Sequence, residues 1–137
     1  MKKMLNTSFV YAIAAMIAGV FFREFTKFNG FTGRTSLSFM HLHLFVLGAL
    51  LFLILELFRM QINLVKQKHF KTFFILYNIG LPLMVVMFFV RGVTQVLETP
   101  LTKSMDAMIS GVAGVGHILT GVGLIILFTC LKKTEKI

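Results

Sequence analysis

The sequence predicts an all-α integral membrane protein, a bundle of four transmembrane helices. Three observations lead to this fold class. Hydrophobic residues make up 57% of the 137 residues, only 14% are charged, and the mean hydropathy is +0.87. Soluble domains carry about a quarter charged residues, and a soluble core of this size cannot bury so much apolar surface. The length allows a single domain, residues 1–137.

Four segments are apolar over the roughly 20 residues that a span requires. They are residues 5–23, 36–58, 71–97 and 105–131. The first span ends at a charged connection with two turn signals, Asn29-Gly30 and Thr32-Gly33. Thr35-Ser36 then supplies helix N-cap residues for the second span.

The third and fourth spans are separated by a short connection that contains Pro100. Inside the third span, Gly80 and Pro82 predict a kink that opens a cavity beside the helix. Ser104 and Asp106 are suited to cap the start of the fourth span.

The formal net charge of +9 indicates orientation in a membrane and not nucleic-acid binding, because the basic residues cluster between apolar runs. Nine fall on the side of both termini: Lys2, Lys3, Arg59, Lys66, Lys68, Lys71, Lys132, Lys133 and Lys136. Five fall on the other side: Arg23, Lys27, Arg34, Arg91 and Lys103. The positive-inside rule therefore predicts cytoplasmic termini.

His41 and His43 lie in the apolar stretch HLHLFVLG of the second span. Ionisable residues at membrane depth usually face the protein interior or a cavity, which makes them candidates for a functional site. Positions i and i+2 differ by about 200° around a helix, so we expect the two rings to serve different neighbours. Hydrogen bonding between helices by neutral imidazoles is the alternative.

His117 lies in the fourth span, within ISGVAGVGHILTGVG. Its neighbours one turn away are small, Gly114 on one side and Gly121 on the other among them. A bare helix surface lets the face of a porphyrin approach while the imidazole binds the iron. Small residues at this spacing are equally typical of close helix packing in membranes, so both interpretations stay open.

Arg91 follows the apolar run MVVMFFV near the outer end of the third span. A buried guanidinium requires a carboxylate or phosphate partner. The propionates of a haem would satisfy it, as would Glu24, Glu56 or a lipid headgroup. We expect Glu56 to pair instead with Arg59, three residues on along its helix.

The stretch HLHLFVLGALLF resembles the His-x-His helix of haem–copper oxidase catalytic subunits, where two histidines one residue apart bind two different haems on opposite faces. Taken end to end, with FFREFTKFNGFTG, FILYNIG and GVGHILTG, the chain resembles a bacterial family of small four-span membrane proteins of unknown function. The oxidase resemblance covers about one helix, and the copper site and proton-channel carboxylates of the oxidases have no counterpart here. Oxygen reduction is therefore not expected.

The oxidase resemblance also implies an assembly. The oxidase catalytic subunit has twelve spans in three groups of four, and the second span of each group carries ligands. A homotrimer of this chain would imitate that arrangement, with haem held across a protomer boundary by His41 of one chain and His43 of the next. An alternative needs no trimer: His41 and His117 of one chain would share an iron.

The leading hypothesis is a b-type cytochrome-like protein that binds haem b for electron transfer or for binding a diatomic gas. His41, His43 and His117 would be the metal ligands, Arg91 and Arg34 would hold the propionates, and Gly114 and Gly121 would line the ring. The expected partners are the lipid bilayer, further copies of the chain, and a redox partner such as a quinol. The alternatives are a non-haem, copper-type metal-binding or transport protein and a structural subunit without a cofactor.

Overall fold

The computed structural model describes residues 3–134, which form four long helical segments. They are α1 (Lys3–Phe28), a second helix in three parts, α4 (Phe70–Val96) and α5 (Lys103–Lys132). The parts of the second helix are α2 (Leu37–His43), the π-helical η1 (Leu44–Leu50) and α3 (Leu51–Arg59). A short 3₁₀ turn, η2 (Leu64–Lys66), lies in the second connection. All four long helices are apolar enough to cross a membrane, which confirms the four predicted spans.

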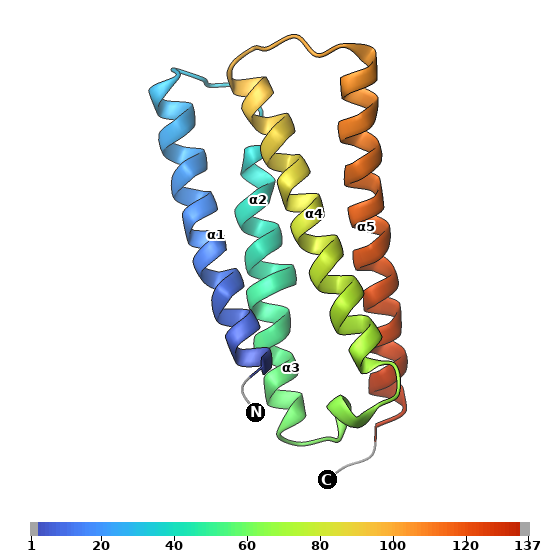
Figure 1. The fold of residues 1–137 in the computed structure, drawn as a ribbon. Coiled ribbons are helices and arrows are strands. Elements are labelled where there is room, and N and C mark those ends of the chain that lie inside the picture. Colours follow the sequence, from blue (N-terminus) through green and yellow to red (C-terminus); the bar gives the residue numbers. More distant parts are fainter. Residues whose placement is uncertain (1–2, 135–137) are drawn as a thin grey trace.

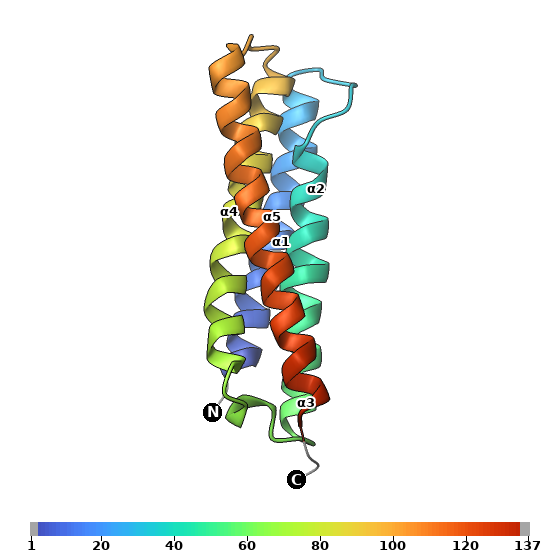
Figure 2. The same ribbon diagram turned by 90° about the vertical axis from the view of Figure 1, so that its right-hand side faces the viewer.

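The helices run up and down, so that both described ends of the chain lie at the same end of the bundle (Figure 1). The second helix packs between α1 and α4, and α5 packs mainly on α4 (Figures 1 and 2). We call the end at which the described chain begins and ends the terminal end, and the opposite one the loop end. His41, His43 and Arg91 all lie in the half of the bundle nearer the loop end, as the depth of each residue along its helix predicts.

Helix α1 extends past the predicted end of the first span, to Phe28. The sequence predicts a connection from position 23 onward. The helix instead continues through Phe25, which packs against the core, and the Thr26 hydroxyl donates to the carbonyl oxygen of Phe22 at 2.8 Å within it. The turn then comes at Gly30, whose φ of +61° fits the predicted Asn29-Gly30 turn.

The second helix widens to a π-helix directly after His43. A π-helix spaces its backbone hydrogen bonds differently and often marks a functional site. Two hydroxyl groups from other helices donate to carbonyl oxygens of this segment: Ser8 of α1 to Ala49 at 2.7 Å and Tyr77 of α4 to Leu47 at 2.8 Å. These bonds fix the widened segment between α1 and α4.

Helices α4 and α5 approach closely through small residues. A Cβ atom added at Gly116 would lie 2.8 Å from the backbone nitrogen of Met84, and one added at Gly80 would lie 2.7 Å from that of Thr120. The backbone at this crossing therefore tolerates no side chain at either glycine. Such packing supplies most of the attraction between helices in a bilayer, where the lipid is as apolar as the protein.

The N-cap of α5 differs from the prediction. The side chain of Thr102 caps the helix by accepting a hydrogen bond from the backbone nitrogen of Met105 at 3.2 Å. Ser104 and Asp106 instead lie inside the first turns of the helix. Asp106 is consequently available for a different contact, described below.

Candidate functional site

His43 and His117 both contact one aromatic ring. The ring of Phe88, from α4, has its centroid 4.9 Å from that of His43 and 5.9 Å from that of His117. Both contacts are edge-to-face. His43 is half-buried and His117 is exposed. Three helices, α2, α4 and α5, therefore bring two imidazoles and one phenylalanine together.

Both imidazoles are held in the same way. The Nδ1 atom of His43 lies 2.8 Å from the carbonyl oxygen of Phe39, and that of His117 lies 2.8 Å from the carbonyl oxygen of Ala113. A carbonyl oxygen only accepts, so each Nδ1 carries the proton and donates it. The lone pair of each neutral ring is then on Nε2. Metal-binding histidines show this arrangement, because the second nitrogen is fixed by a hydrogen bond to a carbonyl or carboxylate.

His41 lies elsewhere. Its ring stacks on Phe22 of α1, with the centroids 6.3 Å apart, and its Cβ atom faces Gly19. Its Nδ1 atom is buried and has no hydrogen-bond partner among the described residues. The two histidines of HLHLFVLG therefore serve different neighbours, as the helix geometry predicts. The structure brings together His43 and His117, and not His41 and His117.

The glycines around His117 divide into two faces of α5. Gly116 and Gly123 pack against α4, where an added Cβ atom would lie within 3.2 Å of Met84 or Tyr77. Gly114 and Gly121 face open space, with no atom within 4 Å of an added Cβ. Helix packing therefore explains Gly116 and Gly123, but it does not explain Gly114 and Gly121. The bare surface that the sequence predicts beside His117 is present, and nothing within the described chain covers these two glycines.

Arg91 pairs with Asp106, which is not among the partners that the sequence suggests. Its Nη1 atom donates to Asp106 Oδ1 at 2.8 Å and its Nη2 atom to Ser110 Oγ at 2.7 Å. A sequence signal for this pair exists, because Arg91 and Asp106 are each a few residues from the short loop that joins two antiparallel helices. Neither Glu24 nor Glu56 is its partner: Glu24 lies 3.8 Å from Arg23, and Glu56 binds Arg59 at 2.6 and 2.9 Å, as expected.

The remaining candidates lie apart from the two histidines. Arg34 is exposed in the connection between α1 and α2, and His69 is exposed at the start of α4. Within residues 3–134, no three His, Cys, Asp or Glu side chains are grouped so that they could hold a metal ion. A haem iron needs only one or two protein ligands, so the paired histidines remain suitable for it.

These features define a class of protein: a helical, multi-pass membrane protein with two imidazoles on one face of the bundle. The chain belongs to the family described as protein of unknown function (DUF2871), whose model matches residues 1–134. No curated protein and no solved structure matches the chain.

The family match confirms the expected membership of a family of unknown function, and the four apolar helices fit the expected membrane protein. The resemblance to haem–copper oxidases receives no support from these comparisons. It rests on the His-x-His stretch of one helix alone. The function must therefore be argued from the geometry around His43 and His117.

Proposed function

We propose that this protein binds haem b on the face of the bundle that carries His43 and His117, as a b-type cytochrome-like protein. His117 is the leading axial ligand and His43 the second. Haem supplies a redox-active iron, used for electron transfer when both axial positions are taken and for binding a diatomic gas when one is open. The proposal includes both electron transfer and the binding of a diatomic gas.

The observation that carries the proposal is the arrangement of the two imidazoles. Each Nδ1 lies 2.8 Å from a carbonyl oxygen of its own helix, so that Nε2 is the nitrogen left to bind a metal. His117 is also exposed and flanked by Gly114 and Gly121, which leave room for a flat ring against α5. His41 lacks such a bond at Nδ1, which is why we place it behind the other two as a ligand.

Arg91 is suitably placed to hold a propionate. Its partner Ser110 is seven residues, two helical turns, from His117 on the same face of α5. The two positions are therefore roughly 10 Å apart along the helix axis. Asp106 and Ser110 occupy Nη1 and Nη2 but not every N–H donor of the guanidinium. Arg34 is proposed as a second cation for the propionates.

The proposal includes an orientation and an assembly. Both termini are placed in the cytoplasm of a bacterium, because seven of the 12 basic residues among residues 3–134 lie at the terminal end. The haem then lies in the outer half of the inner membrane, within reach of a membrane-soluble redox partner such as a quinol. A homotrimer is proposed by analogy with the oxidases, since the exposed face of α5 is open to a neighbouring copy.

Absorption spectra of the detergent-purified protein, oxidised and then reduced, test the proposal. The chain is expressed with haem supplied, beside its His117→Ala, His43→Ala and His41→Ala variants. We expect a Soret band in the wild type, its loss or strong reduction in His117→Ala, a changed ligation spectrum in His43→Ala, and retention in His41→Ala. His69→Ala is the matched control, because this histidine lies outside the membrane spans.

Three results would count against the assignment. A wild-type protein without a Soret band would favour a structural subunit. Bound metal without a porphyrin spectrum would favour the copper-type alternative. Loss of colour in His41→Ala, with colour kept in His117→Ala, would move the site to the other side of the second helix.

A further inference from the structure

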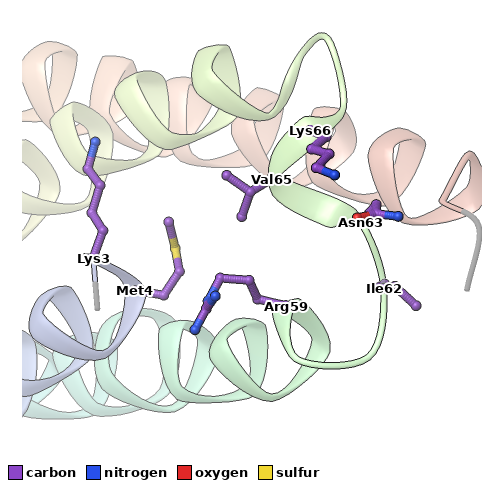
Figure 3. Close-up of a pocket in the computed structure, with 7 residues that line it drawn as sticks. All are labelled: Lys3, Met4, Arg59, Ile62, Asn63, Val65 and Lys66. Atoms are coloured by element: carbon purple, nitrogen blue, oxygen red, sulfur yellow. The ribbon is translucent and has the colours of Figure 1, made fainter. Parts of the chain in front are cut away.

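A basic cleft lies at the terminal end of the bundle, far from the paired histidines. It has a volume of about 440 Å³, and residues of α1, α3 and the second connection line it. Met4 of α1 and Val65 of η2 point into it from opposite sides, and Lys3, Arg59 and Lys66 surround it (Figure 3). The cleft thus has an apolar floor and a cationic rim.

The charge of the rim is largely uncompensated. Glu56 binds Arg59 through both of its carboxylate oxygens. Lys3, Lys66 and Lys71 form no ion pair with any carboxylate among residues 3–134, and Lys3 lies 4.2 Å above the ring of Phe74. Lys71 lines the adjoining cleft, of about 590 Å³, which shares Lys3 with the first. Three ammonium groups from three elements therefore lie around one recess.

The recess continues into a groove between α1 and α4. Two further clefts extend the recess along this groove. The third cleft shares Phe74 and Asn78 with the adjoining cleft that Lys71 lines. The fourth cleft shares Tyr11 and Pro82 with the third. The fourth is lined almost entirely by apolar side chains and ends where Phe21 and Phe89 meet, with ring centroids 5.4 Å apart. The lining thus changes from cationic to apolar along one seam. The groove passes Pro82, beside which the sequence predicts a cavity.

Polar groups along the groove are already bonded within the chain. Tyr11 donates to Asn78 Oδ1 at 2.9 Å, and the amide nitrogen of Asn78 donates to the carbonyl oxygen of Phe74 at 2.8 Å. The hydroxyl of Thr7 donates to the carbonyl oxygen of Lys3 at 2.9 Å. These groups do not require a polar ligand. An alkyl chain can therefore lie along the seam without leaving them unsatisfied.

We propose that this seam is a binding site for one anionic phospholipid. Its phosphate lies among Lys3, Lys66 and Lys71 at the terminal end, and one acyl chain follows the α1–α4 groove towards Pro82. Charge complementarity selects the anionic headgroup, and the apolar groove selects a lipid over a free phosphate ion. The site is independent of the proposed haem, which lies on the other side of the second helix.

Native mass spectrometry of the delipidated full chain tests the proposal. Phosphatidylglycerol, phosphatidylcholine and inorganic phosphate are titrated separately. We expect one phosphatidylglycerol to bind per chain, with phosphatidylcholine much weaker and phosphate not retained. The double variant Lys66→Gln/Lys71→Gln should bind phosphatidylglycerol roughly 10–30-fold more weakly, at about 1 kcal/mol per lysine near a membrane surface.

The matched control is Lys132→Gln/Lys133→Gln, which removes the same charge at the same end of the bundle but from α5, outside the four clefts. It should bind as the wild type does. Equal losses in the two double variants, or equal binding of the two lipids, would overturn the site. Phosphatidylglycerol with a photoreactive acyl chain should label α1 and α4 facing the groove, and labelling confined to other helices would overturn the site as well.

Discussion

At the scale of single residues, the two histidines of HLHLFVLG differ in what holds them. His43 bonds through Nδ1 to its own helix and contacts Phe88, which His117 contacts as well, whereas His41 stacks on α1 with Nδ1 unpaired in the described part of the chain. Helix geometry predicts that they face apart. Helix geometry alone cannot predict which of the two histidines shares a contact residue with His117, because this depends on how α5 is placed beside α2 and α4.

The bare face of α5 beside His117 gives a prediction about single residues. Gly114→Leu should fold normally, because an added Cβ atom there meets nothing within 4 Å. Its side chain should nevertheless block a ring from lying against the helix, and haem content measured by the Soret band per chain should fall severalfold. Gly111→Leu is the control, since this glycine is equally open but lies on another side of the helix from His117. Equal haem content in the two variants would show that no ring lies there.

At the scale of elements, the crossing of α4 and α5 depends on glycines that no side chain can replace. Gly116→Leu would bring a Cβ atom within 2.8 Å of the backbone of Met84. Backbone atoms cannot yield as a flexible side chain can, so we expect the free energy of unfolding in detergent to fall by roughly 1–3 kcal/mol. Gly111→Leu should change it by less than about 1 kcal/mol, in the stabilising direction, because leucine favours helix more than glycine does. Equal destabilisation by both would contradict the crossing.

The sequence predicts the helical elements well, and its failures have identifiable causes. Long apolar runs define the four spans closely, since the bilayer imposes both their length and their composition. The end of α1 was predicted too early, because charged residues at a membrane surface continue a helix as readily as they end it. The π-helical η1 leaves no periodic signal in a stretch that is apolar on every side. The Arg91–Asp106 pair was missed because Asp106 was assigned to capping.

At the scale of the whole molecule, the distribution of basic residues predicts the orientation. With Cys130 replaced by serine, single cysteines are introduced at Thr32, in the loop-end connection, and at Lys68, near the terminal end. A membrane-impermeant thiol reagent added to intact cells should label Thr32→Cys, and should label Lys68→Cys only after the cells are permeabilised, because the basic end stays in the cytoplasm. The reverse labelling would place the paired histidines in the inner half of the membrane.

The absorption spectrum of the wild-type chain, purified after expression with haem supplied, tests the central claim most directly. The account predicts a Soret band that shifts on reduction, with at least one haem for each functional assembly and with the colour dependent on His117. A purified, folded, haem-exposed protein with no Soret band would contradict it.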